Sequence, residues 1–238
     1  MIVRKVIVGR VPLNKLLYAI GEIVQKPNVG VLYVDRIEDS FFDEFISTVD
    51  RDDLGLLVEG RPESGPFACA EWFIPTAIAV FLGKPYFESF LKEMGKDHYS
   101  LLKKGISGLC VKTVSSRRFE PVLMSSPSGK INQSNPYTLS FSVMADTGDG
   151  YSFKLLLPKL KEDFDYHKAT DRFMDFIADY HSDGELSQAF DTIKLSDAPG
   201  GTVLVRYNPK TSKIEWQDHL PSEVRARLNV QQENAADS

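Results

Sequence analysis

The fold class of this chain is decided by residues 29–58, which read VGVLYVDRIEDSFFDEFISTVDRDDLGLLV. Residues 29–34 are apolar and rich in β-branched side chains, which predicts a buried strand. An amphipathic helix is expected next, behind the candidate N-cap residues Asp39 and Ser40. Its apolar face consists of Phe42, Phe45, Ile46 and Val49. Residues 54–58 then predict a further buried strand.

The same alternation of strand and helix begins upstream of this stretch. Residues 3–8 form a short β-branched run, and the apolar residues between Leu13 and Val24 fall on one face of a predicted helix. Three strands separated by two helices predict parallel pairing, because neighbouring parallel strands need a crossover connection. We therefore expect an α/β or α+β fold that opens with a βαβαβ unit.

A block of three helices is expected in the middle of the chain. The apolar run over 68–82 predicts a buried helix whose entry is delayed by Pro75. A second helix is predicted to open at Pro85 and to end at Gly95, and a third to begin behind Asp97. The spacing of apolar residues then changes to two, so residues 109–114 predict a strand.

Antiparallel hairpins and one helix are expected after this block. Apolar and polar residues alternate over 139–143 and over 151–155, around a turn of Asp and Gly, which predicts a hairpin. Residues 166–180 describe an amphipathic helix, and residues 202–207 with 213–216 predict a last hairpin.

The chain is expected to divide into two parts and a tail. Residues 1–112 form the α/β part with the helical block, and residues 113–228 form a mainly antiparallel β part with one helix. The sequence pattern is compatible with one sheet that contains strands from both parts. Residues 229–238 are polar and are expected to be a frayed tail, as chain ends usually are.

Composition argues against several classes of protein. The 238 residues include 33 acidic and 28 basic side chains, and the net charge of −5 provides no broad positive field for nucleic acid. Cys69 and Cys110 match no metal-ligand or disulfide spacing, so neither a zinc site nor a disulfide framework is expected. The first residues lack the apolar run of a signal peptide. We predict a cytoplasmic protein, and the sequence identifies no cofactor.

Three arginines are the strongest candidates for a binding site. Arg10, Arg36 and Arg61 each lie just beyond the carboxyl end of a predicted strand. If these strands are parallel, their carboxyl ends meet at one edge of the sheet, where open α/β sheets bind ligands. Guanidinium groups suit carboxylate and phosphate, so we expect an anionic small molecule there, with Asp35 or Glu63 as a candidate acid or base. The alternative is that the arginines pair with nearby carboxylates, since the chain has no glycine-rich phosphate loop.

Two other motifs suggest chemistry less directly. Residues 146–148, Asp-Thr-Gly, match the tripeptide of aspartic proteases, but turn chemistry between two strands explains them equally well. His167, Asp171 and Asp175 share one helical face and are spaced to bind a metal or to act as an acid/base pair. A charged face opposite an apolar one is usually the solvent side of a helix, so no metal site is predicted.

Three kinds of function remain open from the sequence. The lack of a recognised catalytic motif favours a non-catalytic intracellular binding or protein-interaction module. The first alternative is an enzyme or sensor of an anionic small molecule at the three arginines. The second is peripheral attachment to a membrane through an apolar helix over 72–82, which is shorter than the ~20 residues that span a bilayer. The expected partner is a protein or an anionic small molecule; nucleic acid is not expected, and a membrane is not favoured.

Overall fold

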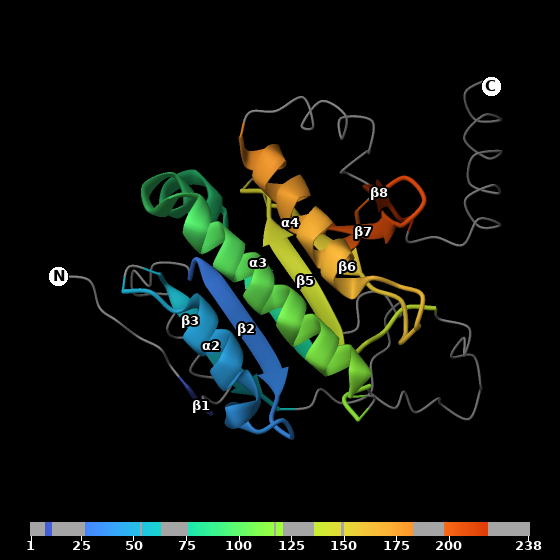
Figure 1. Ribbon diagram of the computed structural model, residues 1–238, viewed down its shortest axis with the longest axis horizontal. Helices are drawn as coiled ribbons and strands as arrows, with labels where there is room; N and C mark the ends of the chain where they lie inside the picture. Colours follow the sequence, from blue (N-terminus) through green and yellow to red (C-terminus); the bar gives the residue numbers. More distant parts are fainter. Residues whose placement is uncertain are drawn as a thin grey trace, which may run out of the picture.

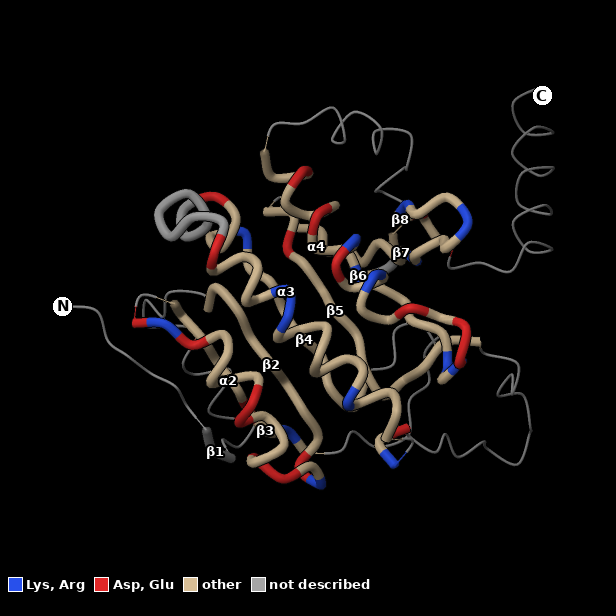
Figure 2. Tube along the Cα trace, viewed as in Figure 1, with Lys and Arg blue, Asp and Glu red and all other residues tan. Residues whose placement is uncertain are grey.

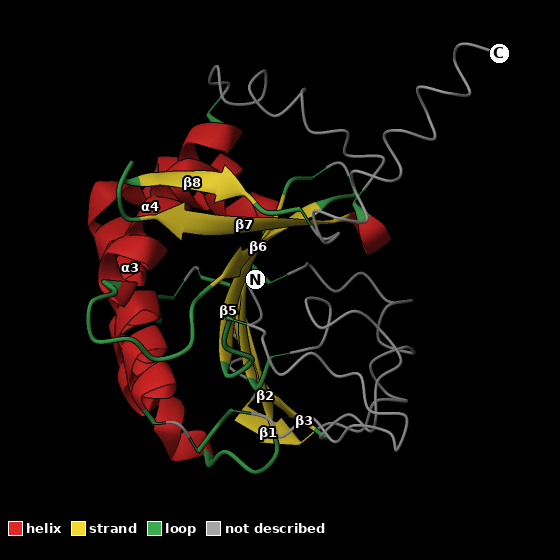
Figure 3. Cartoon of the chain, turned by 90° about the vertical axis from the view of Figure 1, so that its right-hand side faces the viewer, coloured by secondary structure: helices red, strands yellow, loops and turns green. Residues whose placement is uncertain are grey.

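A computed structural model describes residues 8–10, 27–52, 54–62, 76–116, 118–120, 136–148, 150–182 and 198–218. The strands in these segments form one mixed sheet of eight strands. The described α-helices lie together against one face of this sheet (Figures 1 and 3). The predicted α/β or α+β fold class is confirmed.

Three parallel strands form one end of the sheet. In spatial order they are β1 (Val8–Arg10), β3 (Leu56–Arg61) and β2 (Val29–Val34). The crossover from β2 to β3 passes through a 3-10 turn, η1 (Asp39–Phe42), and through α2 (Asp43–Val49). The predicted parallel pairing is confirmed, because β1 and β2 both pair with β3 in the parallel sense. The helix predicted between Leu13 and Val24 falls outside the described residues.

The remaining strands extend the sheet beyond β2. They are β4 (Ile78–Leu82), β5 (Phe141–Asp146), β6 (Ser152–Leu156), β7 (Thr202–Asn208) and β8 (Lys213–Trp216), in that spatial order. The β5–β6 and β7–β8 pairs are antiparallel, which confirms both predicted hairpins. β4 pairs with β5 in the parallel sense, so strands from both halves of the chain belong to one sheet.

The prediction of a helix over 68–82 is wrong for residues 76–82, which are the part of this range that the structure describes. Residues 78–82 form β4, which lies between β2 and β5 in the middle of the sheet. A strand that is covered on both faces reads as a continuous apolar run, and such a run does not differ from a buried helix in periodicity. The hypothesis of membrane attachment required a helix over 72–82, and residues 78–82 are a strand instead. Residues 72–75 lie outside the described part. Among the described helices, none has the length and apolar character needed to cross a membrane.

The helices predicted to begin at Pro85 and behind Asp97 form one continuous helical segment. A π-helical turn, η3 (Tyr86–Phe90), leads into α3 (Leu91–Ser115), a helix of 25 residues. The predicted end at Gly95 and the predicted strand over 109–114 are both wrong. A glycine inside a helix costs only about 1 kcal/mol, which tertiary packing overrides. At Gly105 packing favours glycine, because a Cβ there would lie 2.6 Å from Val49 Cγ2 on α2.

The main core lies between the sheet and the helices. The last described helix is α4 (Tyr166–His181), as predicted, and the Asp165 carboxylate caps it by accepting the Lys168 N–H at 2.9 Å. Alternate residues of the central strands turn fully buried side chains toward α3 and α4. Examples from successive strands are Val58, Val31, Val80, Val143, Leu155 and Val205. This layer fixes the strand ends that carry the candidate site.

Candidate functional site

The carboxyl ends of the three parallel strands meet at one edge of the sheet, as the arginine hypothesis requires. β1 ends at Arg10, which pairs with Gly60, and β3 ends at Arg61, which pairs with Val34 at the end of β2. Arg36 follows β2 by two residues. The backbone positions are therefore close, although the Arg10 side chain lies outside the described part of the structure.

The Arg36 and Arg61 guanidinium groups contact different segments of the chain. Arg61 is half-buried, and its Nη2 donates a hydrogen bond to the Thr76 carbonyl oxygen at 2.7 Å, just before β4. Burial lowers the pKa of Arg61. Arg36 is exposed, and its Nη2 donates to the Phe119 carbonyl oxygen at 3.3 Å. Arg61 thus links the end of β3 to the segment that leads into β4, whereas Arg36 lies at the surface beside the segment that follows α3.

The two carboxylates proposed as acid or base have no established role. Asp35 is half-buried, and its backbone N–H donates to the Arg61 carbonyl oxygen at 2.9 Å. A Cβ on Gly60 would lie 3.1 Å from Asp35 Oδ1 and 3.4 Å from the Tyr33 ring, so the lack of a side chain at Gly60 makes room for both groups. Glu63 lies outside the described residues. An acid/base function for either residue stays a prediction.

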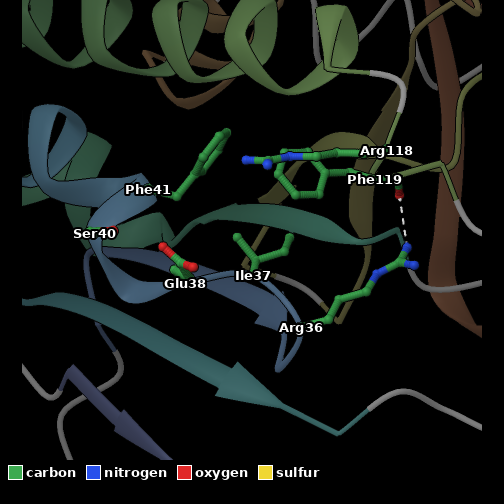
Figure 4. Close-up of a pocket in the computed structure, with 7 residues that line it drawn as sticks. All are labelled: Arg36, Ile37, Glu38, Ser40, Phe41, Arg118 and Phe119. Atoms are coloured by element: carbon green, nitrogen blue, oxygen red, sulfur yellow. Dashed lines mark hydrogen bonds between the residues drawn. The ribbon is translucent and has the colours of Figure 1, made fainter.

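An open pocket of about 370 Å³ lies beside the end of β2 (Figure 4). Two segments far apart in the sequence form it: the connection from β2 to α2, and the residues that follow α3. The lining residues are Arg36, Ile37, Glu38, Ser40, Phe41, Arg118 and Phe119. One of the three arginines singled out in the sequence therefore lines this pocket. We call it the β2 pocket.

Arg118 is the cation of the β2 pocket that sequence reasoning missed. Its guanidinium carbon lies 4.7 Å from the centre of the Phe119 ring, in a cation–π contact, and reaches toward Phe41 (Figure 4). The side chain is exposed and forms no hydrogen bond or ion pair with a described residue. Stacking leaves the N–H groups at the edge of the guanidinium available to an anion. A basic residue next to an aromatic residue just after a helix was the available signal.

The aromatic walls of the pocket are fixed by packing. Phe119 is 4% exposed, and its ring meets the Phe41 ring edge to face at 5.0 Å. Lys112 on α3 lies over the Phe41 ring at 4.3 Å and donates a hydrogen bond to the Phe41 carbonyl oxygen at 2.8 Å. The position of the Arg118 guanidinium therefore depends on a contact between α3 and the connection after β2.

The lining of the pocket contains two positive charges and one negative charge. Arg36 and Arg118 line it, and Lys112 lies behind Phe41. The only carboxylate in its lining is Glu38, which does not cap η1 and has no partner among the described residues. The lining includes one hydroxyl, Ser40, but no histidine or cysteine. These groups suit recognition of a charged ligand by hydrogen bonds and apolar contact.

A second notable carboxylate lies on the sheet face opposite the helices. Glu59 is 6% exposed and pairs in register with Gly9 and Leu32. Burial raises the pKa of its carboxyl group. Lys154, on β6, is also buried on this face. The sequence did not single out Glu59, because it follows an apolar strand without a motif.

The remaining motifs are explained by local structure. Gly148, in the turn between β5 and β6, has a φ of 92° and donates its N–H to Asp146 Oδ1 at 2.8 Å, so the Asp-Thr-Gly sequence forms the hairpin turn. Asp175 accepts hydrogen bonds from Lys103 Nζ at 2.9 and 3.1 Å, which joins α4 to α3. No group of three metal-ligating side chains occurs within the described ranges.

We compared the chain with protein-family models, with curated proteins and with solved structures, and none of them matches it. The site is therefore interpreted from its own geometry.

Proposed function

We propose that this protein is a non-catalytic binding protein, and that its ligand is a small molecule with a carboxylate or phosphate group that occupies the β2 pocket. The observation that supports this proposal is the Arg118 guanidinium, which is stacked on Phe119 at the pocket and has no partner among the described residues. Such a group gives an anion two parallel N–H donors. Arg36 also lines the pocket and adds a second positive charge to it.

A small ligand fits this site better than a macromolecule. A volume of about 370 Å³ lies at the lower end of small-molecule sites, which span about 300–1,000 Å³. Nucleic acid would need an extended positive surface, whereas basic and acidic residues are interspersed over the described part of the chain (Figure 2). The net charge of −5 also opposes it.

The proposal includes a cytoplasmic location. Its support is Cys110, a fully buried free thiol in α3 whose pKa is raised by burial. A thiol in such surroundings behaves as a small apolar side chain and needs no partner cysteine.

Isothermal titration calorimetry with sodium acetate, sodium benzoate and sodium phosphate tests the proposal. We expect at least one anion to bind the wild-type protein, and Arg118→Ala to weaken that binding by about tenfold or more, because a hydrogen bond to a charged group contributes about 1.5–3 kcal/mol. Arg206→Ala is the matched control, since Arg206 is an exposed arginine on β7 paired with Glu215. Binding that Arg118→Ala leaves unchanged would overturn the proposal, and so would a lack of binding by every carboxylate or phosphate compound tested.

A further inference from the structure

The β2 pocket carries two opposite charges that do not neutralise each other. Arg118 and Glu38 both line it, yet they form no ion pair with one another and neither has another partner in the described segments. In Figure 4 the Arg118 guanidinium lies on the upper side of the pocket and the Glu38 carboxylate on the lower side, with Ile37 beside Glu38. The wall therefore presents a cation, an apolar patch and an anion.

A simple anion does not complement this pocket fully. It would satisfy Arg118 but would also bring a second negative charge near Glu38, and like charges close together in a partly desolvated site repel. A ligand that also carries a cation removes this repulsion, because its cation pairs with Glu38. Glu38 would therefore give specificity by repelling an anion that carries no positive charge.

The apolar part of the lining defines the rest of the ligand. Ile37 is 3% exposed, and together with Phe41 and Phe119 it forms the apolar part of the lining. A hydrocarbon group on this surface would be removed from water, at about 25 cal/mol per Å² of apolar area. The volume of about 370 Å³ admits only a small ligand.

We infer that the β2 pocket binds a free α-amino acid with an apolar side chain. Its carboxylate pairs with Arg118, its ammonium group pairs with Glu38, and its side chain contacts Ile37 and Phe41. The inference rests on the proposed function, because it assigns the ligand class for the same pocket. It goes further by giving Glu38 a role in choosing the ligand.

Calorimetric titration with L-leucine, L-phenylalanine and L-methionine tests this ligand class, and each is compared with its N-acetyl derivative. The derivative keeps the carboxylate and loses the ammonium charge. We expect at least one free amino acid to bind at least tenfold more tightly than its derivative. Glu38→Gln should abolish this preference and leave binding of the N-acetyl compound unchanged or stronger.

The outcomes separate the two proposals. Equal binding of a free amino acid and its N-acetyl derivative overturns the amino-acid inference and leaves the anion-binding function intact. If no compound binds at millimolar concentration, the amino-acid inference fails, and the separate anion titration decides the proposed function. Glu162→Gln, an exposed carboxylate before α4, is the control for loss of one negative charge. Thermal melting confirms that each variant is folded, as expected for substitutions at exposed side chains.

Discussion

Polar side chains are hydrogen-bonded in the described core under α3 and α4, whereas two charged side chains at the rim of the β2 pocket form no hydrogen bond with a described residue. In the described interior, no buried side-chain nitrogen or oxygen lacks a hydrogen-bond partner. At the rim, Arg118 and Glu38 have no partner within the described chain. Unpaired polar groups are costly when buried but inexpensive in water, so the interior maintains the fold and the rim remains available for a ligand. Stability and recognition should therefore respond to different substitutions.

Removing a large core side chain should have the largest effect on stability. Phe173 on α4 is fully buried and packs against Phe176. Phe173→Ala should lower the free energy of unfolding by about 3–5 kcal/mol, because it removes apolar burial and leaves a cavity. Urea unfolding followed by circular dichroism measures this. Leu160→Ala, at an exposed leucine, is the control and should change stability by less than about 0.5 kcal/mol.

Removing a buried hydrogen bond should have the next largest effect on the free energy of unfolding. His98 on α3 is 4% exposed; its Nε2 donates to the Val49 carbonyl oxygen at 2.9 Å, and its Nδ1 accepts from the Tyr86 hydroxyl at 3.1 Å. Tyr86→Phe removes the hydroxyl that donates to the buried Nδ1, which should cost about 1–3 kcal/mol. Urea unfolding at neutral pH measures the loss. Tyr151→Phe, at a half-buried tyrosine in the β5–β6 turn, is the control. Equal stability of Tyr86→Phe and wild type would show that this hydrogen bond does not stabilise the interior.

The same histidine should make stability depend on pH. Burial lowers the pKa of His98 in the folded state, and the positive charge of Arg51 acts in the same direction, while the bond to the Val49 carbonyl opposes them. The unfolded chain therefore binds a proton first, below about pH 6.5, and the contribution of His98 to stability is full above that pH and declines as pH falls. Burial lowers the pKa of His181 in the same sense.

A non-titrating variant isolates the contribution of His98. Glu59 and Asp171 have carboxyl pKa values raised by burial, so their effect on stability has the opposite sign. The difference in urea midpoint between wild type and His98→Gln should shrink as the pH is lowered from about 7 to about 5. A difference that stays constant over this range would contradict a neutral buried His98.

Substitution at the pocket rim should have the smallest effect on stability. Arg118 is exposed, and its side chain meets the described part of the chain through the cation–π contact with Phe119, which contributes about 0.5–1 kcal/mol at exposed sites. Arg118→Ala should therefore change the free energy of unfolding by less than about 1 kcal/mol while it weakens ligand binding. A loss comparable to that of Phe173→Ala would mean that the rim supports the fold and that the contrast between the two regions is false.

Regular local patterns were predictable from the sequence, and the central elements were not. Alternating residues around an Asp-Gly turn identified the β5–β6 hairpin, and apolar residues at helical spacing identified α4, because one buried face leaves a clear period. β4 is covered on both faces and has no such period. The continuity of α3 through Gly95 depends on packing against α2 and α4, which a local pattern does not record.

The candidate site was predictable only in part. Parallel strands implied a common edge for the three arginines, and Arg36 lies at the β2 pocket as a result. Arg61 instead donates inward to the Thr76 carbonyl. Arg118 was missed because its position depends on a contact between segments 83 residues apart, where Arg36 meets the Phe119 carbonyl. No local pattern predicts such a contact.

The central claim is that the β2 pocket binds a ligand through Arg118. Proton–nitrogen correlation spectra of the protein, recorded during titration with sodium acetate, sodium phosphate and L-leucine, test it most directly. The account predicts that at least one compound shifts the Arg118 side-chain Nε–H signal together with the amide signals of residues 37–41, and that Arg118→Ala abolishes the amide shifts. Shifts confined to other parts of the sheet, or no shifts with any compound, would contradict it.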